Sequence, residues 1–298
     1  MKRVSSAFAP GCPLPVQVDT SRGAIECAIA GFGSVIVALH GGMGGYDQSW
    51  LLAKALSANL DSHRVVAVSR PGYLGTDLDR GRSPDEQADL ICALLDALDV
   101  TDATLVAVSA GGPSALQFAA RHPRRCRSLV LVSTCTERLE TPPEIFKRLR
   151  AMETLARVPG LAALLRWRTT SKPDRAASRS IRDPEVRART LGHPEAGPLL
   201  QALQSGVFER LRDRLPGTIN DIQQLASLRD LPTAPISLPV LIVHGEADAV
   251  VPFRHADGLL RRVPEAELLA IPHGEHVSLL THLELVRERA ARYLRGES

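Results

Sequence analysis

The 298-residue chain has little of what marks secreted, metal-binding or membrane-spanning proteins. Its five cysteines are odd in number and scattered, with no C-x-x-C pair; they are Cys12, Cys27, Cys92, Cys126 and Cys135. This distribution favours reduced thiols in a cytosolic protein over a disulfide framework. No stretch approaches the roughly 18 apolar residues that a membrane-spanning helix requires. We therefore expect no transmembrane segment.

Lysine and aromatic residues are also scarce. Four lysines stand against 32 arginines, and aromatic residues make up 4% of the chain, so no interface that would set an oligomeric state stands out. The net charge of +3 is too small to indicate nucleic-acid binding. Lys2 and Arg3 imitate the start of a signal peptide, but the apolar stretch after them is short and is followed by prolines. We expect a cytoplasmic protein without nucleic-acid or membrane partners.

Short apolar segments alternate with amphipathic ones in the first 136 residues. The apolar segments, rich in β-branched residues, are 35–39, 65–69, 105–108 and 129–132. They read as strands that are buried on both faces. Helical patterns lie between them, at about 48–60, 84–98 and 112–121. This alternation predicts an α/β fold with a mostly parallel sheet and helices on both of its faces.

The alternation stops near residue 137 and resumes near residue 240. The stretch between is rich in helical patterns, at 144–157, 160–169, 199–215 and 221–228, and carries a net charge of +5. Strand patterns return at 240–243 and 268–271, with helical patterns near 253–262 and 277–294. We therefore predict a core formed by residues 1–136 and 239–298, interrupted by a helical cap, residues 137–238.

Ser109 lies where the third predicted strand runs directly into a helix. Ala107 and Gly111 flank it two residues away on each side, and such small neighbours are what a tight strand–turn–helix junction requires. This is a small-x-Ser-x-Gly version of the nucleophile elbow, with Ala in place of the usual first glycine. Free N–H groups at a helix start also stabilise developing negative charge. The alternative is a serine that merely caps the helix.

A glycine-rich segment, residues 40–45, follows the first predicted strand. Glycines allow backbone N–H groups to approach a ligand closely, as an oxyanion hole requires. The N–H groups of Gly42 and Met43 are the candidate donors to pair with that of Ala110. A phosphate-binding loop is the alternative, but the segment lacks a Walker Lys-Ser/Thr and a G-x-G-x-x-G pattern. His40 is expected to order this loop.

Asp248 and His276 each follow one of the last two predicted strands. In open α/β sheets, ligands bind at the carboxyl ends of the strands, and both residues are expected there together with Ser109. His273 and His276 lack a third ligand with metal-binding spacing, so we expect no metal.

Together these segments resemble the α/β-hydrolase superfamily, in particular its serine-nucleophile branch with a helical cap inserted after the sixth strand. The resemblance covers about residues 1–136 and 238–298. The matching motifs are His40-Gly41-Gly42, Arg70-Pro71-Gly72-Tyr73, Ser109-Ala110-Gly111-Gly112-Pro113, His244-Gly245-x-x-Asp248 and Gly274-x-His276. The resemblance implies the α/β-hydrolase fold and no cofactor. Members with an Asp nucleophile are disfavoured by Ser109.

By this resemblance Ser109 attacks a carbonyl carbon, His276 takes its proton and Asp248 orients the imidazole. The chain order Ser, Asp, His is the order that this superfamily uses. His273 is the alternative base, and we expect His276 because it opens the last helix as the base of the family does. The residue before the base is Glu275, where the family has a small residue. Glu137 is the first alternative to Asp248.

The sequence thus predicts a serine hydrolase that cleaves a small ester, lactone, thioester, amide or activated C–C bond through an acyl-enzyme on Ser109. Two alternatives stay open: a lyase or cofactor-free oxygenase that forms no acyl-enzyme, and a ligand-sensing receptor that retains the triad. The expected partner is a small-molecule substrate. Trp167, Phe208 and several leucines in the cap are candidates to line an acyl pocket, although packing onto the core explains them equally well.

Overall fold

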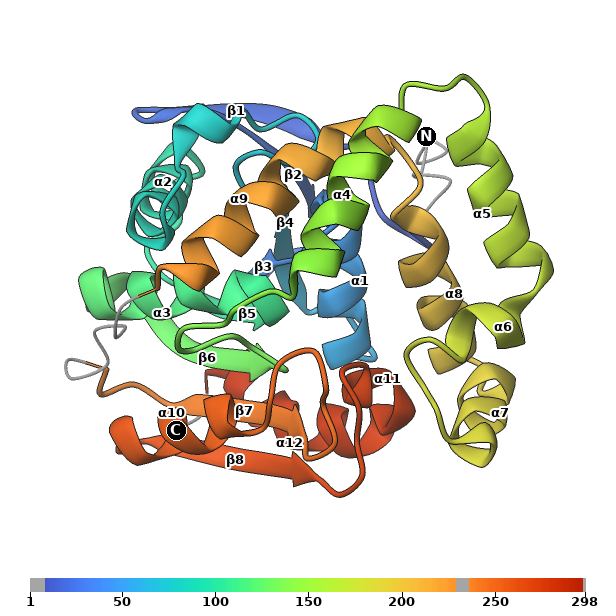
Figure 1. Cartoon of the computed structure of the whole chain (residues 1–298). Coiled ribbons are helices and arrows are strands. Elements are labelled where there is room, and N and C mark those ends of the chain that lie inside the picture. The colour runs from blue at the N-terminus through green and yellow to red at the C-terminus, as the bar shows by residue number, and fades with distance from the viewer. Residues whose placement is uncertain (1–8, 229–235, 297–298) are drawn as a thin grey trace.

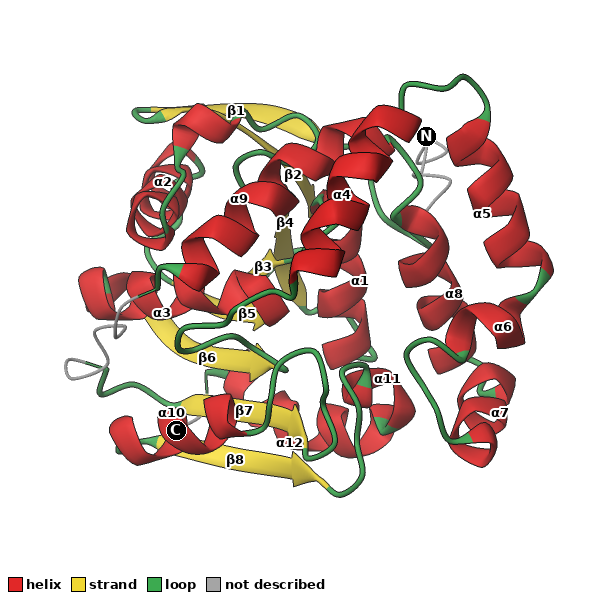
Figure 2. Ribbon diagram, in the orientation of Figure 1, coloured by secondary structure: helices red, strands yellow, loops and turns green. Residues whose placement is uncertain are grey.

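The computed structural model describes residues 9–228 and 236–296 and joins its strands into one eight-stranded sheet (Figures 1 and 2). The strands are β1 (Val16–Thr20), β2 (Gly23–Ala30), β3 (Ser34–Leu39), β4 (His63–Val68), β5 (Ala103–Val108), β6 (Cys126–Val132), β7 (Val240–Gly245) and β8 (Ala266–Ile271). Their order is β1-β2-β4-β3-β5-β6-β7-β8. Strands β3 to β8 run parallel, whereas β2 is antiparallel to both β1 and β4.

Helices cover both faces of this sheet. One hydrophobic cluster packs α1 (Tyr46–Leu56), α11 (Ser278–Thr281) and α12 (Leu283–Arg295) on one face. A second cluster packs α2 (Pro84–Ala97), α3 (Gly112–Arg121) and α10 (Arg254–Arg262) on the other face. Burial on both faces is why the parallel strands read as continuous apolar runs. Within residues 9–228 and 236–296, no helix combines the length and apolar character needed to cross a bilayer.

The six predicted strands are confirmed as β3 to β8, with bounds shifted by at most three residues. The sequence analysis missed β1 and β2. Most of β1 is exposed at the sheet edge, and Glu26 interrupts the apolar pattern of β2. This carboxylate is buried and accepts hydrogen bonds from the Ser69 hydroxyl at 2.7 Å and from the Gly75 N–H at 3.0 Å. The predicted helix over 277–294 is divided at His282 into α11 and α12.

All elements described between β6 and β7 are helical. They are α4 (Pro143–Leu155), α5 (Leu161–Ser171), α6 (Pro173–Ala177), α7 (Pro184–Gly192), α8 (Ala196–Gly206), the 3₁₀ turn η4 (Leu211–Arg214) and α9 (Leu215–Ala226). The sequence analysis missed α6 and α7. The single helix that it predicted over 199–215 is interrupted between α8 and η4. Residues 229–235 of the predicted cap, and the signal-like start with Lys2 and Arg3, lie outside the described residues.

A buried ion pair fixes α9 to the core. Arg70, in the loop after β4, donates from Nη1 to Asp221 Oδ1 at 2.9 Å and from Nη2 to Asp221 Oδ2 at 2.6 Å. The Tyr73 hydroxyl donates to the same Oδ2 at 2.5 Å. The Arg70 side chain is only 2% exposed, so the pair is isolated from solvent. A guanidinium bound at both nitrogens by one carboxylate fixes orientation as well as distance.

A second buried pair lies at the start of the same segment. Arg214 donates from Nη2 to Asp47 Oδ2 at 2.7 Å and from Nη1 to Asp47 Oδ1 at 3.1 Å, which joins η4 to α1. The Gly217 N–H also donates to the Gly72 carbonyl at 2.8 Å. By contrast, Trp167 on α5 is 64% exposed. The segment from η4 to α9 is therefore bound to the core much more closely than α5 is.

We predict that Asp221→Asn lowers the free energy of unfolding by about 3–5 kcal/mol, because Arg70 then stays buried without a charged partner. Urea unfolding of the full chain measures this loss. The matched control is Asp213→Asn, which breaks only the solvent-exposed pair with Arg210. That variant should lose at most about 1 kcal/mol. Equal losses in the two variants would contradict the role given to the buried pair.

His255 anchors α10 to the end of β6. Its Nδ1 accepts the Thr136 N–H at 3.1 Å, and its carbonyl accepts the Thr136 hydroxyl at 2.7 Å. Burial lowers the pKa of His255 to about 4, against the opposing effect of the nearby Glu137 carboxylate. The ring is therefore neutral in the folded protein at a pH where the unfolded chain already binds a proton. Stability from this group is complete above about pH 6.5 and declines toward about pH 4.

Replacing His255 by Asn keeps an acceptor for the Thr136 N–H but removes the titration. Between about pH 7 and about pH 5, the parent should lose on the order of 2 kcal/mol more unfolding free energy than His255→Asn does. Urea unfolding of both proteins at the two pH values provides the comparison. Parallel losses would mean that the folded protein protonates His255 as easily as the unfolded chain does.

Candidate active site

Ser109 occupies a strained turn between β5 and α3. The turn is the 3₁₀ element η2 (Ser109–Gly111), and the backbone of Ser109 has φ +53°. Side chains disfavour this left-handed conformation, which persists where the surrounding structure imposes it and which clusters at functional sites. A Cβ on Gly111 would lie 2.7 Å from the His40 carbonyl oxygen, so only glycine fits there. The structure therefore has the predicted strand–turn–helix junction at Ser109.

The glycine-rich loop passes directly against Ser109. A Cβ on Gly41 would lie 3.0 Å from the Ser109 Cβ. His40 orders the loop from beneath: its Nδ1 bonds to the Gly41 carbonyl at 2.6 Å, and its Nε2 accepts the Arg70 N–H at 3.0 Å. Burial, and then the charge of Arg70, hold the pKa of His40 well below its usual value. The ring is therefore neutral and serves as a structural support.

The cap contributes a hydrogen bond to this loop. The Met43 N–H donates to the Thr218 hydroxyl on α9 at 3.0 Å, and that hydroxyl donates in turn to the Arg214 carbonyl at 2.8 Å. Met43, expected as an oxyanion donor, therefore has its N–H bound within the protein. Gly42 and Ala110, the other two expected donors, both lie beside Ser109 on the wall of one cavity.

Asp248 and His276 are in direct contact. The Nδ1–H of His276 donates to Asp248 Oδ2 at 2.8 Å, which leaves Nε2 as the free acceptor of the neutral ring. The other oxygen, Oδ1, accepts the N–H groups of Val250 and Val251 at 2.8 and 2.9 Å. Burial raises the pKa of Asp248, but the hydrogen bonds from His276 and from the backbone outweigh it, so the pKa is lowered. The carboxylate is thus held ionised beneath the imidazole.

Two glycines bring the loops of Asp248 and His276 together. A Cβ on Gly245 would lie 2.2 Å from the Gly274 carbonyl oxygen, and the Ala247 N–H donates to that oxygen at 2.9 Å. The Ser133 hydroxyl also donates to the His276 carbonyl at 3.1 Å. Glycine at position 245 is therefore required for the close approach of the two loops, and Gly274 is required because a Cβ there would lie 2.8 Å from Ile271 Cγ2.

The alternative residues lie elsewhere. His273 is exposed on the turn before Gly274, with φ +56°. Glu137 pairs with Arg254 at 2.9 Å, in a partly exposed ion pair. Glu275 reaches the cap, where its Oε1 accepts the Arg182 N–H at 2.6 Å. Glu275, where the family has a small residue, therefore ties the His276 loop to the segment before α7.

Ser109, His276 and Gly42 line two cavities that meet at the serine. The smaller, of 280 Å³, is mostly apolar; its walls include Leu51, Leu52, Leu199, Leu203, Val207, Leu279 and Leu280. The larger, of 860 Å³, extends beneath α4 and α9 and includes Arg138, Glu140, Thr141 and Arg254. In the described ranges, no group of three or more His, Cys, Asp or Glu side chains is arranged to hold a metal ion.

Of the cap residues that were candidates for an acyl pocket, leucines line a cavity at Ser109 and the two aromatic residues do not. Trp167 is mostly exposed, and Phe208 lines a different cavity within the cap. The cap part of the apolar wall includes Leu199, Leu203 and Val207, which recur every four residues along α8 and the turn after it. This spacing is visible in the sequence and marks one face of a helix. Spacing alone did not predict that this face of the helix lines the cavity at Ser109.

Comparisons with known proteins agree with this architecture. The family model of the alpha/beta hydrolase fold matches residues 34–283. The uncharacterized hydrolase YcgS of Bacillus subtilis is 28% identical over 261 residues, which are 86% of this chain and 89% of that protein. The pimeloyl-[acyl-carrier protein] methyl ester esterase of Aromatoleum aromaticum is 30% identical over 263 residues, 84% of this chain and 93% of that protein.

A solved structure also agrees with this architecture. The alpha/beta hydrolase fold protein from Nakamurella multipartita superposes with a TM-score of 0.84 at 30% sequence identity, covering 96% of this chain and all of the other. The sheet order, the helices on both faces and the family match over 34–283 all agree. The chain therefore belongs to the alpha/beta hydrolase fold family.

Proposed function

We propose that this protein is a serine hydrolase that cleaves a small carboxylic ester through an acyl-enzyme on Ser109. One observation carries the proposal: the strained Ser109 and the Asp248-bound His276 line the same two cavities. A nucleophile, a base and an orienting carboxylate arranged in this way form the constellation of acyl transfer. The relative named as a methyl ester esterase supports an ester as the bond cleaved.

In the first half-reaction, Ser109 Oγ forms a bond to the ester carbonyl carbon while His276 Nε2 takes the hydroxyl proton. Asp248 holds Nδ1–H in place, so the correct nitrogen faces the serine, and its charge stabilises the imidazolium. The carbonyl oxygen becomes an oxyanion. We assign its stabilisation to the N–H groups of Gly42 and Ala110, because the Met43 N–H is bound to Thr218.

Collapse of the tetrahedral intermediate breaks the bond to the alcohol, which leaves with the proton from His276. A water molecule then attacks the acyl-enzyme, and His276 takes its proton and returns one to Ser109 Oγ. The products are a carboxylic acid and an alcohol, and the enzyme regains its starting protonation state. No oxidant, reductant or cofactor enters this sequence of steps.

The two cavities at Ser109 divide the substrate between them. An acyl chain fits the apolar 280 Å³ cavity, because burying apolar surface against its leucine-rich wall is favourable. The alcohol part fits the larger cavity of 860 Å³, where Arg138, Glu140 and Arg254 supply polar groups. The proposed substrate is therefore an ester of an apolar acid with a bulkier or more polar alcohol.

The first test replaces the nucleophile. Ser109→Ala should reduce kcat/KM for p-nitrophenyl butyrate by roughly 10⁴–10⁶-fold, because nucleophile and base act as a unit. Thermal unfolding should stay close to that of the parent. A fluorophosphonate probe should label the parent at Ser109 and leave the variant unlabelled. An unlabelled parent, or a variant within tenfold of parental activity, would overturn the acyl-enzyme and direct attention to lyase, oxygenase or receptor functions.

The second test separates the chosen residues from their alternatives. Asp248→Asn should lower kcat/KM by about 10⁴-fold, since the imidazole then adopts the wrong tautomer. Glu137→Gln, the matched carboxylate control, should keep kcat/KM within about threefold of the parent because it breaks only a partly exposed pair.

His276→Ala should be inactive, whereas His273→Ala should keep most activity. An inactive His273→Ala beside an active His276→Ala would reverse the assignment of the base.

A further inference from the structure

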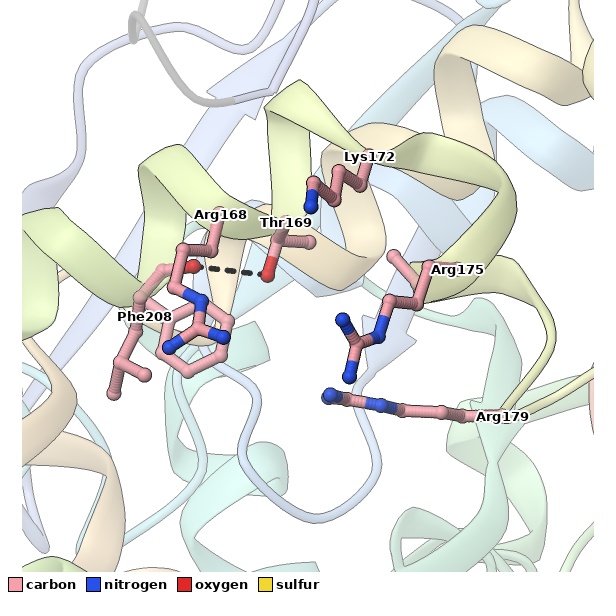
Figure 3. Close-up of a pocket in the computed structure, with 8 residues that line it drawn as sticks. Arg168, Thr169, Lys172, Arg175, Arg179 and Phe208 are labelled. Atoms are coloured by element: carbon pink, nitrogen blue, oxygen red, sulfur yellow. Dashed lines mark hydrogen bonds between the residues drawn. The ribbon is translucent and has the colours of Figure 1, made fainter.

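A separate cavity in the cap is surrounded by positive charge. It has a volume of 210 Å³ and shares no lining residue with the two cavities at Ser109. Its lining residues are Leu165, Arg168, Thr169, Lys172, Arg175, Ala176, Arg179 and Phe208 (Figure 3). Four of these eight side chains are cationic and none is acidic. The cavity lies between α5, α6 and the turn after α8.

These four cations lack carboxylate partners in the part of the chain that the structure describes. Acidic residues that adjoin lining residues in the sequence are engaged elsewhere, since Asp174 binds Arg187 and Glu209 binds Arg166. Arg168 lies on α5, Lys172 between α5 and α6, Arg175 on α6 and Arg179 in the turn after it, and all four side chains are exposed. Four cations gathered at one cavity create a positive potential that attracts an anion.

The cavity also has an apolar side. Leu165 and Phe208 line it. Figure 3 shows the side chains of Arg175 and Arg179 both extending from the right of the view toward its centre. Thr169 Oγ1 donates to the Leu165 carbonyl at 3.0 Å, so its hydroxyl proton is used within α5. The ligand that complements these walls has a multiply charged anionic group and a short apolar part.

We propose that this cavity binds the phosphate or diphosphate group of a small ligand whose apolar part lies against Leu165 and Phe208. Guanidinium groups bind phosphate oxygens through two parallel hydrogen bonds, and three arginines with one lysine match a doubly charged group better than a single carboxylate. The concave shape fits one such group and its neighbouring atoms. Binding here does not depend on the reaction at Ser109.

Calorimetric titration of the full chain with inorganic phosphate, diphosphate and phenyl phosphate tests the proposal. Diphosphate and phenyl phosphate should both bind more tightly than inorganic phosphate, the second by up to about tenfold through burial of its ring. Rising salt concentration should weaken all three. Vesicles of phosphatidylglycerol in phosphatidylcholine distinguish the sources: binding to vesicles that free phosphates displace identifies a lipid headgroup, and binding of the free compounds alone identifies a soluble ligand.

The deciding variant is Arg175→Gln with Arg179→Gln; both side chains are exposed, so the fold should stay intact. It should bind phenyl phosphate at least about tenfold more weakly than the parent, because two charge-assisted contacts are removed. The matched control, Lys147→Gln with Arg148→Gln, removes the same charge from the exposed surface of α4 and should bind like the parent.

The proposal would be overturned by no binding of any phosphate compound at millimolar concentration, or by equal weakening in the test and control variants. Binding of duplex DNA without binding of the small phosphates would also overturn it, in favour of a nucleic-acid surface. Hydrolysis of p-nitrophenyl butyrate should be unchanged in the Arg175→Gln/Arg179→Gln variant, because neither residue lines a cavity at Ser109. Failure of the phosphate site is thus distinguishable from failure of the esterase proposal.

Discussion

The guanidinium of Arg70 connects the parts of the molecule that meet at the serine. It donates to the His40 carbonyl at 2.9 Å, to the Gly41 carbonyl at 3.4 Å and to both oxygens of Asp221. A buried ion pair contributes little net stability compared with apolar side chains of the same size, but a broken one leaves an uncompensated charge. The pair therefore acts mainly on geometry: the glycine-rich loop and α9 each keep one position relative to the sheet.

The position of α9, fixed by the Arg70–Asp221 pair, also affects the proposed oxyanion hole. Thr218 lies one turn before Asp221 on α9, and its hydroxyl binds the Met43 N–H. The loop that carries Gly42 is thus held from the core side by His40 and from the cap side by Thr218. Preorganised N–H groups stabilise developing charge because no reorientation is needed during the reaction. Parts of the cap and of the core share this task.

The sequence was most informative where local chemistry decides the structure. Strands β3 to β8 were predictable because burial on both faces leaves continuous apolar runs, and Ser109, Asp248 and His276 were placed at strand ends by short motifs. Strand β1 is exposed at the edge, and α6 and α7 are short and polar, although Pro173 and Pro184 mark where they begin. The Arg70–Asp221 pair spans 151 residues, and no local pattern signals such a contact.

The distribution of these contacts divides the insertion into two parts with different freedom to change. The part from η4 to α9 meets Arg70, Asp47 and Gly72 of the core, so a substitution there requires a matching change far away in the chain. Helices α5 and α6 make few such demands; they border the cap cavity, and Ser180, three residues after α6, lines the apolar cavity at Ser109. Exchange of whole caps between relatives would disrupt the first part, whereas exchange of α5 and α6 alone would preserve the catalytic loop. Sequence change within this architecture is thus expected to accumulate in α5 and α6, while the segment from η4 to α9 stays fixed.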